Sequence, residues 1–103
     1  MRVAIKFAYD GKGFSGYARQ PGQQTIEQTL LDTLKKQKIL TDAKTSCFRT
    51  ASRTDRGVSA LGNVSAFDTI VPADEILTRL NRMADMYIYG AAEVASHFYP
   101  RHA

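Results

Sequence analysis

The sequence has a single cysteine, Cys47, and it lacks tryptophan, long apolar runs and low-complexity tracts. One cysteine cannot form a disulfide within the chain, and the absence of any Cys-X-X-Cys or Cys/His cluster argues against a structural zinc site. The first residues alternate and carry charge, so neither a signal peptide nor a membrane span is expected. A reduced, cytoplasmic protein with no membrane partner is the simplest interpretation of these absences.

Internal repeats are absent as well, which argues against a repeat array. The length of 103 residues fits one compact domain, and a hydrophobic share of 44% is normal for a chain with a buried core. Lys and Arg number 14 against 10 Asp and Glu, which gives a net charge of +4. This basic balance is compatible with a nucleic-acid partner without demonstrating one.

Hydrophobic alternation predicts four strands. Residues 2–9 alternate with a period of two, the pattern of a half-buried strand. Further strands are expected at residues 46–51, 63–68 and 86–94. In the last of these segments, one side carries Tyr87 and Tyr89 and the other carries Met86 and Ile88.

Two helices are predicted between these strands. The first begins at Thr25, which stands three residues before Gln28 in capping-box spacing. The second opens at Val71-Pro72, because proline is tolerated in the first turn of a helix. The apolar stripes consist of Ile26, Leu30, Leu31 and Leu34 in the first helix, and of Ile76, Leu77, Leu80, Met83 and Ala84 in the second.

The order β-α-β-β-α-β predicts an α+β, ferredoxin-like fold, with a four-stranded antiparallel sheet and both helices on one face. The other face is then free to bind a ligand or to pack against another element. Cys47 falls inside the second predicted strand and is expected to be a small buried hydrophobe. Residues 97–103 begin a further segment and stop in mid-pattern, so the chain is expected to be a piece of a longer protein.

The most informative string is Arg53-Thr54-Asp55-Arg56-Gly57-Val58. The two arginines create a positive potential at the Asp55 carboxylate, which favours its ionised form, the state that a nucleophile needs. The same residues also fit an Asx-type turn, in which Asp55 bonds to the backbone near Gly57 and the arginines are solvated. On these residues alone the turn is the favoured interpretation, because short motifs match by chance.

Motifs in a fixed order favour the nucleophile. Arg53-Thr54-Asp55-x-Gly57-Val58-x-Ala60, followed by Gly62 and Phe67, resembles the signature of the A-family tRNA pseudouridine synthases. Further stretches resemble that family in its own order: Tyr9-Asp10-Gly11-x-x-Phe14-x-Gly16-Tyr17-x-Arg19-Gln20, Thr25-Ile26-Glu27 with Leu30, Leu80-Asn81, and Phe98-x-x-Arg101. The departures resemble the archaeal or eukaryotic style of the family: Ser52, Arg56, Ser59 and Asn63.

The resemblance implies an enzyme that detaches uracil from its ribose and rejoins it through carbon in the anticodon stem-loop of tRNA, without metal or organic cofactor. Asp55 would be the nucleophile, attacking either the sugar or the base. Arg53 would pair with Asp55 in the free enzyme and assist the flipped uridine, although a surface arginine anchoring the loop is an equal alternative. In the family the tyrosine that stacks on the target base lies beyond Ala103. The chain is therefore expected to be an N-terminal part that is inactive by itself, and the whole enzyme a homodimer.

Contacts to tRNA are expected from Arg19, Arg56, Lys12 and Tyr17, although a solvated charge is the preferred interpretation of Lys12 and equally of Arg49. Tyr17 also fits a role in pinning a glycine-rich loop to the core. The alternative function is a non-catalytic RNA-binding or dimerisation module of the same fold. RNA-recognition modules stack bases on aromatics of their third strand, and residues 63–68 lack that aromatic set.

Overall fold

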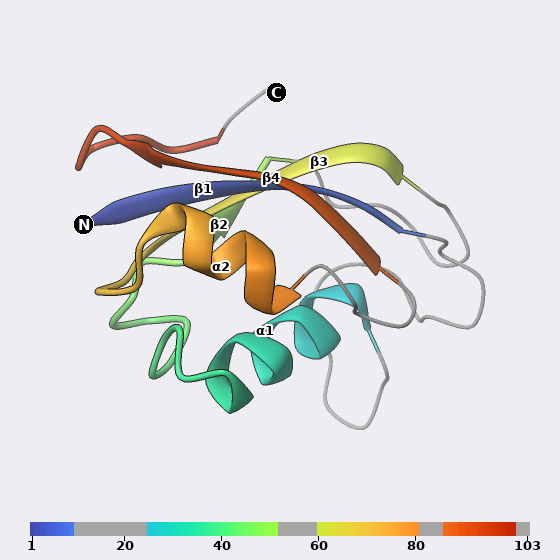
Figure 1. Ribbon diagram of the computed structural model, residues 1–103, viewed down its shortest axis with the longest axis horizontal. Coiled ribbons are helices and arrows are strands. Elements are labelled where there is room, and N and C mark those ends of the chain that lie inside the picture. Colours follow the sequence, from blue (N-terminus) through green and yellow to red (C-terminus); the bar gives the residue numbers. More distant parts are fainter. Residues whose placement is uncertain (10–24, 52–59, 81–85, 101–103) are drawn as a thin grey trace.

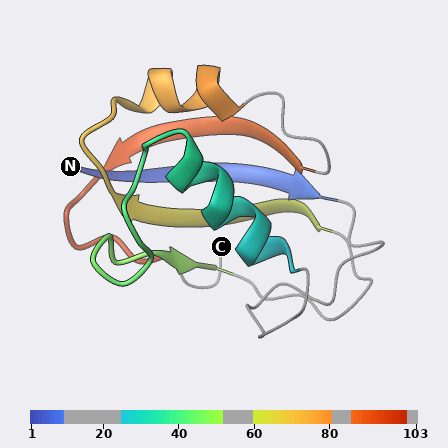
Figure 2. The same ribbon diagram turned by 90° about the horizontal axis from the view of Figure 1, so that it is seen from below.

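The computed structural model describes residues 1–9, 25–51, 60–80 and 86–100. The elements in these ranges are β1 (Arg2–Tyr9), α1 (Ile26–Lys36), β2 (Arg49–Thr50), β3 (Ala60–Asp68), α2 (Ala73–Leu80) and β4 (Met86–Val94). The strands pair antiparallel in the order β2-β3-β1-β4. Both helices lie on one face of this sheet (Figure 1), and Figure 2 shows them crossing it side by side. The predicted ferredoxin-like fold is confirmed.

The core lies between the sheet and the two helices. The alternation of β1 sends Val3, Ile5 and Phe7 to the helix side, where all three are completely buried. The helical residues expected to meet them are buried too: Ile26, Leu30, Leu31, Leu34, Ile76 and Leu80. Burying a large aliphatic or aromatic side chain stabilises the fold by about 1.5–3 kcal/mol, so these stripes are the main reason that both helices choose the same face.

Helix α1 has a defined beginning and end. The Thr25 side chain accepts a hydrogen bond from the Gln28 backbone N–H at 3.2 Å, as the capping spacing predicts. At the other end, the N–H of Ile39 donates to the Leu34 carbonyl at 2.9 Å, and the N–H of Lys38 donates to the Lys35 carbonyl at 3.0 Å. This Schellman arrangement requires a left-handed residue, and Lys38 has a φ of 58°.

Because glycine adopts that left-handed conformation without a Cβ penalty, Lys38→Gly is expected to stabilise the chain by about 0.5–1 kcal/mol. The melting temperature should rise by several degrees in a thermal denaturation experiment. Lys35→Gly is the matched control, because the same change inside the helix should cost a similar amount. A lower melting temperature for both variants would contradict the capping role of Lys38.

The second strand is much shorter than predicted. Residues 46–51 run along β3, since the Asp68 N–H donates to the Ser46 carbonyl at 2.7 Å and the Ala51 N–H donates to the Val64 carbonyl at 2.8 Å. Only Arg49–Thr50, however, form a strand. The expectation of a buried strand position for Cys47 is wrong. Cys47 ends a turn with a φ of 49° and is partly exposed.

That turn has its own polar support. The Asp42 carboxylate accepts hydrogen bonds from the backbone N–H and the hydroxyl of Thr45, at 2.8 and 2.7 Å. These bonds, the backbone one first, lower the pKa of the Asp42 carboxyl. The backbone N–H groups of Ser46, Cys47 and Phe48 also donate within the turn, to the carbonyls of Asp42, Lys44 and Ala43, so they do not pair with β3.

Helix α2 begins at Ala73, just after Pro72, so the predicted start was early by about one residue. Its expected apolar residues Met83 and Ala84 lie outside the described residues. Strand β3 begins at Ala60, three positions before the predicted start at Asn63. In β4, Met86 and Ile88 face the core and Tyr87 and Tyr89 are exposed, as the alternation predicts. No helix among the described residues is long and apolar enough to cross a membrane.

Candidate functional site

The six predicted site residues lie outside the described residues. Arg53, Asp55 and Arg56 fall in segment 52–59, and Lys12, Tyr17 and Arg19 fall in segment 10–24. Their roles therefore stay predictions. The structure describes the framework to which both segments are joined.

That framework brings the attachment points of the two segments together. Tyr9, the last residue of β1, is paired with Ala60, the first residue of β3, and also with Met86, the first residue of β4. Directly paired residues of antiparallel strands have Cα atoms about 4.5–5.5 Å apart. Figure 2 shows that α1 begins at this same end of the sheet. Segment 10–24 thus begins, and segment 52–59 ends, at the same end of the sheet, although they are far apart in sequence.

Tyr9 gives this end a rigid base. Its side chain is only 5% exposed, and its ring stacks on Phe7 with the centroids 5.9 Å apart. Thr25, which precedes α1, is fully buried and capped into the helix. Functional residues on loops depend on such a rigid scaffold for their positions.

The sheet face opposite the helices is polar at one end and carries small side chains in the middle. The strand register places Lys6 beside Val64 of β3 and Gly90 of β4, and Ala4 beside Ala66 and Ala92. A hollow of about 640 Å³ lies above these small residues and is closed on one side by residues 98–100. In Figure 1 the segment after β4 lies on the side of the sheet away from the helices. The open face is therefore partly covered, as the sequence analysis allowed.

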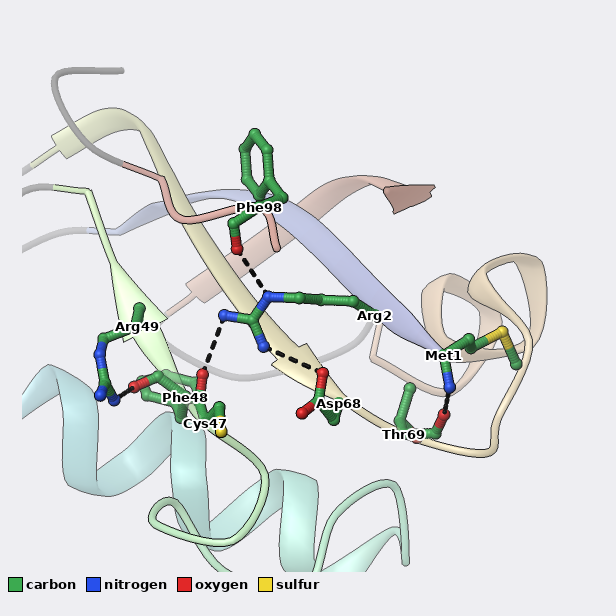
Figure 3. A network of polar contacts seen from close by, with 8 residues as sticks. All are labelled: Met1, Arg2, Cys47, Phe48, Arg49, Asp68, Thr69 and Phe98. Atoms are coloured by element: carbon green, nitrogen blue, oxygen red, sulfur yellow. Dashed lines mark hydrogen bonds and ion pairs between the residues drawn. The ribbon is translucent and has the colours of Figure 1, made fainter. Parts of the chain in front are cut away.

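Arg2 fastens this covering segment to the sheet (Figure 3). Its Nε donates to the Phe98 carbonyl at 2.6 Å and its Nη2 to the Cys47 carbonyl at 2.9 Å. Its Nη1 lies 3.1 Å from the Asp68 carboxylate, and its guanidinium lies 5.1 Å from the centre of the Tyr99 ring. Arg2 is only 3% exposed. One side chain thus joins β1, the end of β3, the turn before β2 and the C-terminal segment.

The alternation of residues 2–9 gave Arg2 no role beyond a place in a strand, and this network was missed. The available signal was the pairing of the first residue of β1 with Asp68, the last residue of β3. Opposite charges at directly opposed strand positions attract. The other two partners are the backbone carbonyls of Cys47 and Phe98. Their positions depend on loop conformation, so they cannot be predicted from the pattern of residue types.

Arg49 is held by local contacts. Its Nη1 donates to the Phe48 carbonyl at 2.8 Å, and its guanidinium lies 5.9 Å from the Tyr99 ring centre. Whether Arg49 also contacts phosphate or is a solvated surface charge stays a prediction.

Comparison with known proteins covers nearly the whole chain. No protein-family model matches the chain. Curated relatives named tRNA pseudouridine synthase A are 51% identical in Thermococcus sibiricus, 48% in Pyrococcus furiosus and 41% in Methanosphaera stadtmanae. These alignments cover 98%, 98% and 94% of the chain. The chain is homologous to part of tRNA pseudouridine synthase A.

The chain spans 38%, 37% and 35% of the length of these three synthases. All three come from archaea, in line with the archaeal or eukaryotic style of the motifs. Because the alignment with the Thermococcus sibiricus synthase runs along almost the whole chain, it includes both segment 10–24 and segment 52–59. The similarity to tRNA pseudouridine synthase A therefore extends over the parts of the chain that carry every predicted site residue.

Proposed function

We propose that residues 1–103 are the N-terminal, nucleophile-bearing domain of a tRNA pseudouridine synthase that isomerises uridine in the anticodon stem-loop of tRNA. The observation that carries the proposal is the 51% identity along 98% of the chain, which includes the Arg53-Thr54-Asp55 string. The pairing of Tyr9, to which segment 10–24 is joined, with Ala60, to which segment 52–59 is joined, supports it, because catalytic and RNA-binding residues of one site must meet in space.

In this reaction the bond between N1 of uracil and C1′ of ribose breaks, and a bond between C5 and C1′ forms. A proton leaves C5 and a proton is taken up at N1, so the reaction is a redox-neutral isomerisation. Asp55 acts as the nucleophile that bonds transiently to the substrate, and Arg53 pairs with its carboxylate in the free enzyme. A stacked uridine is out of reach, so it is flipped out at a cost of a few kcal/mol.

Phosphate contacts from Arg19, Arg56 and Lys12, with Tyr17 beside them, hold the tRNA in register. The proposal includes a homodimer of the full-length protein, with cytoplasmic tRNA as its substrate.

The test is pseudouridine formation on an unmodified tRNA transcript, mapped by carbodiimide modification and primer extension. The full-length protein that contains this chain is expected to convert uridines in the anticodon stem-loop and to leave a transcript without that stem-loop unmodified. The chain by itself is expected to give little or no product. No conversion by the full-length protein would overturn the proposed activity, and conversion elsewhere in the tRNA would overturn only the assignment to the anticodon stem-loop.

A further inference from the structure

Two tyrosines on the open face of β4 are left in contact with solvent. Tyr87 is 60% exposed and Tyr89 is 41% exposed. Their rings are stacked, with centroids 5.7 Å apart and planes inclined at 28°. Each ring has a large apolar surface whose burial would be favourable, so an exposed stacked pair marks a surface that takes a partner.

A β-bulge positions Tyr89. Phe7 is paired with Ile88 while Lys6 is paired with Gly90, which leaves Tyr89 as the extra residue of β4. Bulges of this kind redirect a side chain. The Tyr89 hydroxyl reaches β3, where a Cβ built on Gly62 would lie only 2.9 Å from it. Any larger residue at Gly62 would displace this ring, so the glycine gives Tyr89 its place above the sheet.

Lys6 is the described charged residue closest to the pair in the strand register, since Tyr87 is paired with Ala8 and Lys6 with Gly90. The charged residues on this face, among those the structure describes, are Arg2, Lys6, Arg49 and Asp68. The one carboxylate, Asp68, is paired with Arg2 at 3.1 Å. Lys6 is exposed and has no ion pair with another described residue, and its side chain extends beside Gly90. A lysine with no ion pair among the described residues, on the same face of the sheet as exposed rings, suits a ligand that has both an aromatic face and an anion.

We propose that Tyr87, Tyr89 and Lys6 form a platform for an unpaired nucleotide of the tRNA, with the base stacked on the Tyr87 ring and Lys6 at the phosphate. Every base has a π-face, so stacking on tyrosine tolerates any sequence, and a lysine contact holds the backbone. An apolar protein surface is a poorer occupant, because covering the rings would desolvate Lys6 without supplying a carboxylate. The platform rests on the proposed function, since it assumes that the ligand is tRNA.

The test uses the full-length protein that contains this chain and a fluorescein-labelled, unmodified tRNA transcript, with the Kd measured by anisotropy. Tyr87→Leu removes the aromatic face at an exposed position and is expected to raise the Kd about tenfold, whereas Tyr87→Phe keeps the ring and should stay within about twofold. Lys6→Gln should weaken binding and lower the salt dependence by about one phosphate contact. Lys36→Gln on α1 removes the same charge from the helix side and should change neither.

Pseudouridine formation by the wild-type protein is measured in parallel, which separates this inference from the proposed function. Weaker binding by Tyr87→Leu but not by Tyr87→Phe supports the platform, whether or not the wild-type protein forms product. Equal Kd values for the two Tyr87 variants overturn the platform, and they leave the proposed function intact if product is formed. A lowered melting temperature of Tyr87→Leu with unchanged Kd also overturns it, because the rings would then pack against protein.

Discussion

Asp55→Asn in the full-length protein is expected to abolish pseudouridine formation while leaving folding and tRNA binding nearly intact. Asparagine keeps the shape of the side chain but lacks the charge and the basicity that a nucleophile needs, so the loss should exceed a thousandfold, about 4 kcal/mol at the transition state. As a residue of a connecting segment, Asp55 should tolerate the amide within about half a kcal/mol of stability. The measurements are product formation, melting temperature and the Kd for an unmodified transcript.

The alternative for Asp55 is a structural role in an Asx-type turn. Lost activity together with a collapsed melting temperature would favour that turn, and retained activity would refute the nucleophile. Ser59→Ala is a suitable control from the same segment, because it removes a small polar side chain without touching the proposed chemistry. It should leave product formation within about twofold, because no step of the proposed reaction uses the Ser59 hydroxyl.

Arg2→Met is expected to have the largest effect on stability. The change keeps much of the aliphatic stem but removes the donors to Phe98, Cys47 and Asp68, leaving two partly buried carbonyl oxygens without their partner. An unsatisfied buried acceptor costs about 1–3 kcal/mol. Leaving the Asp68 carboxylate without its ion pair adds little to this cost, because that side chain is 47% exposed and can be hydrated. A loss of roughly 2–4 kcal/mol should appear in urea denaturation of the chain.

Arg79→Met is the matched control for this effect. Arg79 also pairs with a carboxylate, Glu75, at 2.7 Å, and donates to the Gln37 carbonyl at 2.7 Å, but its side chain is 34% exposed. Exposed i,i+4 ion pairs contribute about 0.3–0.5 kcal/mol, so this variant should lose less than about 1 kcal/mol. Equal losses for the two arginines would show that the buried network around Arg2 adds nothing to stability.

The fold was predictable because its periodic signals agree with one another. The alternation in β1 and the stripe of α1 both describe faces that are buried, and burial is what the periodicity of apolar residues records. The error in β2 has the opposite origin. Cys47 adopts a left-handed conformation that favours glycine or asparagine, so its residue type gave no warning that a turn replaces the strand.

The candidate site likewise has one part that was predicted from the sequence and one part that was not. The motif around Asp55 was recognised from the order of its residue types. The pairing of Tyr9 with Ala60 shows that one end of its segment and one end of segment 10–24 are joined to neighbouring points of the sheet. The stacking of Tyr87 on Tyr89 required more than alternation, because it depends on a bulge and on the space left by Gly62. Neither feature follows from hydrophobic pattern, since both arise from the register between strands.

The place of β1 in the sheet has a consequence for how the protein is made. This strand is synthesised before both of its partners, yet it is central in the sheet. Its neighbours are β3 and β4, whose residues pair with Arg2 from positions 68 and 94. At about 5–20 residues per second, β1 waits several seconds for its first partner and longer for its second. During that interval an alternating apolar strand has two open edges, which is the condition that invites pairing with other nascent chains. Early binding of β1 by a chaperone would therefore protect the yield of folded protein more than later assistance.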